Sequence, residues 1–172
     1  MAGVQEELET RQPGGPGVRR EIPCGSADFD ELASNLVTRG HGYRVRVRGS
    51  SMYPTIRDGD VVTVAPCEAG ALRLGDIIFY RRPGGHVAHR LVSRSRDSSL
   101  LTTRGDAHTY SDAPFPSARL IGRVVTVEMN GHVVRLDTPL QRWMGLARVA
   151  VRPWRERVPA RLRPLLFRRW VR

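Results

Sequence analysis

Residues 43–80 read YRVRVRGSSMYPTIRDGDVVTVAPCEAGALRLGDIIFY, and this stretch decides the fold class. Apolar or aromatic residues alternate with arginine over 43–48, which is the period of a strand with one buried face. Two short apolar runs follow at 61–65 and 77–80, each preceded by a turn-forming pair of glycine and aspartate. Repeated short strands separated by such turns predict a mainly β domain.

The same pattern continues as far as residue 136. Four more short apolar runs lie at 87–92, 100–103, 120–128 and 133–136. Turn formers that contain glycine separate several of them, at 83–85 and 130–131. About seven strands at this spacing predict a β sandwich or a partly closed barrel.

The segments on either side of the strands have a different composition. Prolines and glycines at 13–17 interrupt residues 1–22, so we expect a flexible leader there. Over 26–40 a serine, early acids and apolar residues at helical spacing predict a short amphipathic helix. We therefore divide the chain into this leader, a domain over 23–137 and an Arg-rich helical tail over 138–172.

The basic residues exclude several kinds of chemistry. All 28 basic residues among the 172 are arginines, so a Ser-Lys dyad, a Schiff base and a P-loop lysine are excluded. Two cysteines, Cys24 and Cys67, cannot make a disulfide framework, and no Cys/His spacing is typical of a zinc site. We expect neither a cofactor nor a metal ion.

Targeting segments are not visible in the sequence. No secretory signal pattern occurs, and no run of about 18 apolar residues could span a membrane. We therefore expect a cytoplasmic protein whose contact with a membrane, if it has one, is peripheral.

The tail holds most of the positive charge. Residues 139–172 contain ten arginines and one acid, Glu156, a net charge of +9 (ten minus one), mixed with tryptophan and leucine. Its prolines predict two or three short helices. Such a mixture suits an interfacial helix on an anionic membrane surface, and the alternative is packing on the β domain or on a second copy. Nucleic-acid binding ranks last, because no helix-turn-helix pattern accompanies the charge.

One loop and two later segments carry residues that could form a hydrolytic site. Ser51 lies beside a serine and glycine and before a proline, which can present a hydroxyl, although an isolated Ser-Ser pair is usually a turn. His89 sits in an apolar strand pattern, either as a positioned base or on an exposed β face. Asp106 and Asp112 could each orient an imidazole or cap a turn.

Short motifs around these residues occur in a definite order. They are Gly49–Thr55, Gly59–Asp60, Leu74–Ile78, His89–Arg90, Arg104–Asp112 and Gly122–Val124. This series resembles the ordered boxes of the signal peptidase I superfamily of serine peptidases, which also contains the self-cleaving SOS and phage repressors. The resemblance covers about residues 43–129, half of the chain, and implies the β fold of that superfamily.

The resemblance also implies a role for each candidate residue. The chain has histidine where the common version of the superfamily has lysine, so it is similar to the version with a Ser-His-Asp triad. Ser51 would be the nucleophile, His89 the general base and Asp112 the residue that orients it. Asp106 would support its loop. The backbone N–H of Ser51 would be the first oxyanion donor, and the Ser50 hydroxyl could supply a second.

The implied reaction is hydrolysis of a peptide bond through an acyl-enzyme, with a precursor or leader peptide as the substrate and partner. We expect this peptide to lie beside Ser51 as an extended strand and to contact Met52 and Pro54. Two alternatives stay open. One is a catalytically idle module that binds peptide, lipid or nucleic acid on the same fold. The other is a self-cleaving regulator that is cut at Ala2–Gly3 or Cys24–Gly25. The sequence leaves the oligomeric state open.

Overall fold

The computed structural model describes residues 6–8, 20–22 and 42–157, and the described chain is mainly β. Its strands are β1 (Glu6–Leu8), β2 (Arg20–Ile22), β3 (Tyr43–Arg46), β4 (Val61–Ala65), β5 (Ile77–Arg82), β6 (Gly85–Arg94), β7 (Leu100–Arg104), β8 (Phe115–Pro116), β9 (Leu120–Met129) and β10 (His132–Arg135). The helical segments are the 3-10 turns η1 (Ala69–Ala71) and η2 (Ser117–Arg119) and the α-helix α2 (Pro139–Arg157).

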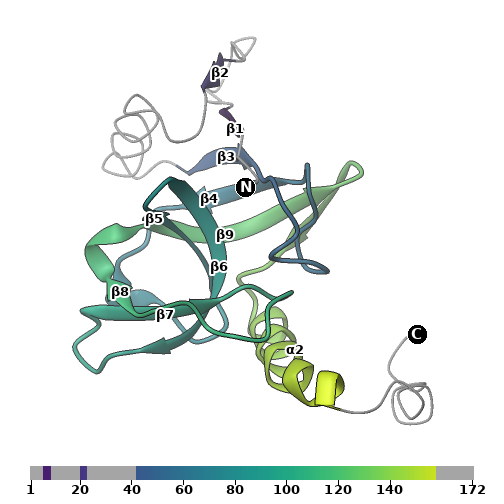
Figure 1. Cartoon of the computed structure of the whole chain (residues 1–172). Helices are drawn as coiled ribbons and strands as arrows, with labels where there is room; N and C mark the ends of the chain where they lie inside the picture. Colours follow the sequence, from purple (N-terminus) through teal and green to yellow (C-terminus); the bar gives the residue numbers. More distant parts are fainter. Residues whose placement is uncertain (1–5, 9–19, 23–41, 158–172) are drawn as a thin grey trace.

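Strands β3 to β10 form one antiparallel sheet. Their order is β3-β4-β9-β5-β6-β7-β8, and β10 pairs with β9. The long strand β9 joins the two halves, because it pairs with β5 over its first residues and with β4 and β10 over the rest. Figure 1 shows the sheet curving round, with α2 below it.

Irregularities in the strand pairing account for the curvature. The register shifts between Thr63 and Val64 where β4 meets β9, and between Phe79 and Tyr80 where β5 meets β9. A third shift lies in the pairing of β6 with β7. Each such bulge bends a strand and increases its twist. The sheet therefore curls on itself, which confirms the predicted mainly β fold in its partly closed form.

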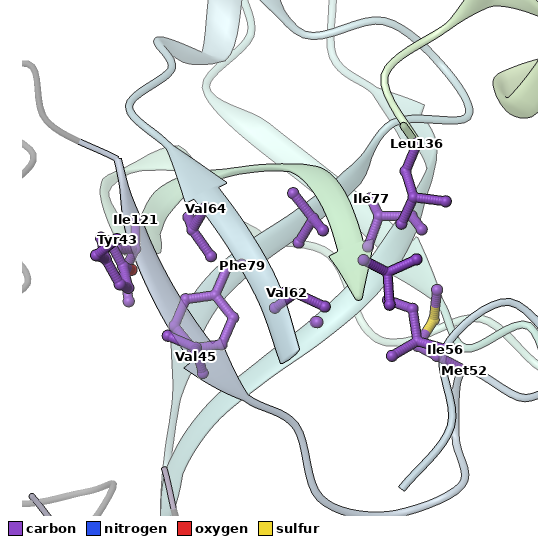
Figure 2. Packing of buried hydrophobic residues seen from close by; sticks show 13 residues of the cluster. Tyr43, Val45, Met52, Ile56, Val62, Val64, Ile77, Phe79, Ile121 and Leu136 are labelled. Carbon is purple, nitrogen blue, oxygen red and sulfur yellow. The ribbon is translucent and has the colours of Figure 1, made fainter. Parts of the chain in front are cut away.

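The core has two parts, which lie on opposite faces of β5. Successive side chains of a strand point to opposite faces, so Ile77 and Phe79 enter one cluster while Ile78 and Tyr80 enter the other. Figure 2 shows the first cluster, with Met52 next to Ile56 at one end. Burying one such large apolar side chain stabilises the fold by about 1.5–3 kcal/mol. The central strands are thus packed on both faces, and they fix the positions at which the connecting loops begin and end.

The strands expected from the sequence are all present. The seven predicted runs are β3 to β7, β9 and β10. Their turns have the expected left-handed backbone, with φ of +84° at Gly59 and +79° at Gly131. The additional strand β8 was not predicted, because two residues, one of them proline, show no alternation.

The N-terminal predictions fall largely outside the described residues. This holds for the helix expected over 26–40 and for both proposed self-cleavage positions. Within the expected leader, β1 and β2 pair antiparallel, so the range 1–22 contains some regular structure. The two strands lie on either side of the proline and glycine run at 13–17, which explains why that run does not prevent their pairing.

The described part of the tail, residues 138–157, differs from the predicted short helices. Here one helix, α2, runs from Pro139 to Arg157 and continues through Pro153, whereas residues 158–172 lie outside the described chain. Proline is tolerated in the first turn, where its missing N–H would have no partner, and Thr138 caps this end by accepting the N–H of Gln141 at 3.2 Å.

Candidate active site

Ser51 lies in the loop that joins β3 to β4, and this loop is held on several sides. The N–H of Gly49 donates to Asp58 Oδ1 at 2.7 Å, which closes the loop on itself. The Ser51 carbonyl accepts the N–H of Ala107 at 2.8 Å, from the loop that follows β7. Next to Ser51, Met52 is buried in the core with 2% exposure. The position of the Ser51 hydroxyl is therefore fixed by neighbours distant in sequence.

His89 lies in the middle of β6, which is paired with β5 on one side and with β7 on the other. Its side chain is 2% exposed. Nε2 lies 3.1 Å from Ser51 Oγ, and Nδ1 lies 2.7 Å from Asp112 Oδ2. Because a carboxylate can only accept, Nδ1 carries the proton and Nε2 presents its lone pair to the Ser51 hydroxyl.

Asp112 is anchored to the end of β7 and to β5. Its N–H donates to the Thr103 carbonyl at 2.8 Å, and its Oδ2 accepts the hydroxyls of Thr103 at 2.6 Å and Tyr80 at 3.3 Å. Burial raises the pKa of Asp112, but hydrogen bonds from His89 and Thr103 outweigh burial and hold the pKa below its ordinary value. Burial also raises the pKa of Tyr80 to about 12, so its hydroxyl stays a donor.

We expect Thr103→Val to raise the pKa of Asp112 and to lower the free energy of unfolding by about 1–2 kcal/mol at pH 7, because a half-buried carboxylate loses a donor. A lowered pKa in the folded state gives stability that is present above the ordinary carboxyl pKa and lost as the pH falls through the folded value. The loss caused by the variant should therefore shrink in acid. Carboxyl ¹³C NMR titration and urea unfolding measure the two effects.

The matched variant is Thr103→Ser, which keeps the hydroxyl and should keep the low pKa of Asp112. If serine and valine raised this pKa equally, the hydrogen bond from residue 103 would not be its cause.

A buried ion pair lies beside the three aligned residues. Arg90 and Asp106 are 1% and 2% exposed, and two hydrogen bonds of 2.7 Å join the guanidinium to both carboxylate oxygens. Nη1 of Arg90 also donates to the Gly75 carbonyl at 2.7 Å. Because Arg90 follows His89 directly, its side chain leaves the strand on the opposite face. The expected supporting role of Asp106 thus has a definite partner.

Helix α2 packs against this ion pair. A Cβ atom on Gly145 would lie 2.1 Å from Cζ of Arg90, so only glycine allows the helix to come this close. Arg148 donates to the hydroxyl of Thr55 at 3.1 Å, and that hydroxyl donates in turn to Asp106. The helix therefore contacts the residues that support the Ser51 loop.

The loop after β7 carries two aromatic side chains that form a row with the ring of His89. The ring of His108 meets His89 edge-on at 5.5 Å, and Tyr110 stacks on His108 at 5.2 Å. Tyr110 is 66% exposed, so this row of rings leads from the buried imidazole to the surface. A Cβ on Gly105 would lie 2.6 Å from the Ser51 carbonyl oxygen, which makes glycine necessary at this approach.

The other sequence-predicted residues divide into two groups. Ser50 and Pro54 are exposed beside Ser51, where a bound peptide could reach them. The expected contact between Met52 and the substrate is corrected by the structure. The side chain of Met52 is buried and belongs to the core cluster with Ile56. An apolar residue next to the loop serine is here an anchor for the loop.

The described part of the chain shows neither a metal-binding group of side chains nor a membrane-spanning helix. Over residues 42–157 and the two N-terminal strands, no group of three or more His, Cys, Asp or Glu side chains could hold a metal ion. No helix in the same ranges is long and apolar enough to cross a membrane.

A comparison with known protein families gives a match over much of the chain. The profile of the Peptidase S24-like family matches residues 16–125, more than half of the chain. The chain belongs to the Peptidase S24-like family. No curated protein matches it. Membership confirms the superfamily that the sequence resembles and a serine-peptidase type of fold.

The S24-like match contains Ser51, His89, Asp106 and Asp112 and stops at residue 125. It ends inside β9, so β10 and α2 lie beyond it. The helix that packs against Arg90 therefore lies outside the matched region.

Sequence reasoning missed several residues of the candidate site. Tyr80, Thr103 and Thr55 donate to the two aspartates, and His108 flanks the imidazole. Only Thr103 carried a local signal, as a polar residue at the end of an apolar strand just before Gly105. The others become neighbours through strand register and loop packing.

Proposed function

We propose that this protein is a serine endopeptidase of the Ser-His-Asp type that cleaves a precursor or leader peptide through an acyl-enzyme. The observation that carries the proposal is the continuous alignment of Ser51 Oγ, both ring nitrogens of His89 and Asp112, with separations of 3.1 and 2.7 Å. A module that only binds a peptide has no need for a hydroxyl, an imidazole and a carboxylate in this order.

The proposed reaction follows from the protonation states. Ser51 Oγ attacks the carbonyl carbon of the peptide bond while His89 Nε2 takes its proton, and the Asp112 carboxylate stabilises the imidazolium. The C–N bond then breaks, and His89 gives the proton to the departing amine. Water then attacks the ester carbonyl as His89 takes its proton, the bond between the acyl carbon and Ser51 Oγ breaks, and His89 returns the proton to Oγ. Each such proton transfer contributes typically about 10²- to 10⁴-fold to the rate.

The oxyanion that forms on the carbonyl needs donors. We assign the backbone N–H of Ser51 as the first donor and the Ser50 hydroxyl as the second. The substrate would lie as an extended strand past Pro54, with the exposed rings of Tyr53 and Tyr110, at 54% and 66% exposure, available to its side chains.

The test is intact-protein mass spectrometry after treatment with a serine-acylating β-lactone probe. The wild type should gain one adduct, whereas Ser51→Ala should gain none because the nucleophile is missing. His89→Ala should label at least about 10²-fold more slowly because the base is missing.

The matched control is Ser93→Ala, which removes an exposed hydroxyl from the same strand as His89 and should label like the wild type. A peptide library incubated with each variant gives a second readout. If no adduct formed and no peptide were cleaved in a manner that needs Ser51, the idle binding module would replace this proposal. An adduct that survived Ser51→Ala would also contradict it.

A further inference from the structure

The face of α2 that meets the domain is well defined. Arg142 donates to Asp76 at 3.2 Å and to the Asp137 carbonyl at 2.6 Å, and Gly145 lies against Arg90. Val149 is 7% exposed. Positions 142, 145 and 149 fall within about 60° on a helix of 3.6 residues per turn. These contacts fix which side of α2 faces outward.

The outward side carries large apolar residues. Leu140, Trp143 and Val151 are 64%, 62% and 44% exposed, and they fall within about 80° of one another, opposite the docked face. We call these three residues the outer stripe. Isolated exposed apolar residues are ordinary, but three on one helix face, one of them a tryptophan, mark a surface that contacts something.

The net charge of the C-terminal sequence indicates what kind of partner the outer stripe would contact. Residues 139–172 carry a net charge of +9 (ten arginines minus Glu156), and the last fifteen residues, 158–172, add five of those arginines and no acid. Arg148 is exposed on α2 itself. A second copy of the chain would bring the same charge to the contact and would be repelled. The partner is therefore anionic and offers an apolar surface.

A nucleic acid and an anionic lipid bilayer are both negatively charged, but they differ in whether they offer an apolar surface. A nucleic acid attracts arginine through its phosphates, but its backbone gives Leu140 and Val151 nothing apolar to enter. An anionic bilayer offers phosphate groups that attract arginine and, just below them, a hydrocarbon layer that apolar side chains can enter. Tryptophan favours the interface between these two layers. We propose that the outer stripe of α2 docks the protein on an anionic lipid bilayer. This inference is independent of the proposed peptidase activity.

Docking would also set the position of the proposed active site relative to the bilayer. Gly145, on the docked face of α2, lies against the residue that follows His89. The bilayer and the proposed active site would thus lie on opposite sides of α2, separated by the helix and by strand β6.

The test is sedimentation of the full chain with lipid vesicles. Wild-type protein should sediment with vesicles of phosphatidylcholine mixed with phosphatidylglycerol, and only weakly with phosphatidylcholine alone, and binding should fall as salt is added. Leu140→Glu with Trp143→Glu should weaken binding about 100-fold, because each large side chain contributes about tenfold.

The matched control is Leu100→Glu with Val133→Glu. It makes the same charge change at exposed positions of 45% and 65% on β7 and β10, away from α2, and should bind as the wild type does. Circular dichroism confirms that each variant is folded, and Val151→Glu gives a milder variant of the same stripe.

Several outcomes would overturn the proposal. Failure to sediment with either vesicle would do so, as would equal binding to both vesicles or equal loss in both double variants. Retention of an oligonucleotide without vesicle binding would assign the charge to nucleic acid. A dimer in light scattering that the stripe variant makes monomeric would assign the stripe to a second copy.

Discussion

Asp112→Asn should slow the acylation of Ser51 by about 10²- to 10⁴-fold while the protein stays folded. Asparagine has the shape of aspartate and can keep its oxygen where Thr103, Tyr80 and His89 all donate to Oδ2. What it lacks is the negative charge that stabilises the imidazolium formed when His89 takes the serine proton. The loss therefore measures mainly this charge.

The measurement is the rate constant of probe labelling, followed by intact mass. The control is Asp97→Asn, an exposed aspartate in the turn between β6 and β7 whose pKa hydrogen bonds from Ser95 and Ser99 lower to about 2. It should label at the wild-type rate. If Asp112→Asn labelled as fast as this control, Asp112 would have no part in activating Ser51.

Asp106→Asn should lower the free energy of unfolding by about 3–5 kcal/mol. The substitution leaves the guanidinium of Arg90 charged and without its counter-ion at 1% exposure, and breaking one half of a buried pair costs about this much. Urea unfolding followed by circular dichroism measures it. An effect of this size is a large part of the whole stability of a domain.

The surface counterpart is Asp58→Asn. Asp58 faces Arg48 at 3.9 Å with side chains 61% and 40% exposed, so its loss should cost only about 0–1 kcal/mol. The double variant Arg90→Met with Asp106→Leu removes both buried charges and should be more stable than Asp106→Asn. If the double variant were the less stable of the two, the unpaired charge would not explain the cost.

The strand pattern was predictable because its causes are local. Alternation over 43–48 and the turn residues at 130–131 lie within a few positions of one another, and β3 and β10 appear where these signals place them. The continuous helix α2 was not predictable in the same way. Its second proline is a local signal to stop, yet the helix continues through it to Arg157.

The identity of the candidate site residues was also available from the sequence. Ser51, His89 and Asp112 were named through the order of motifs that the chain shares with a known superfamily. The structure brings the three side chains within hydrogen-bond distance. Their roles stay proposals until labelling tests them.

The amino-acid sequence by itself determined the mainly β class, the positions of seven strands and the absence of a catalytic lysine, since each depends on composition or on neighbours along the chain. Only the tertiary structure decided that Thr103 and Tyr80 hold Asp112, and that Gly145 lets α2 lie on Arg90. These contacts join residues far apart in sequence. They depend on strand register, bulges and the close approach of a helix, which no local pattern encodes.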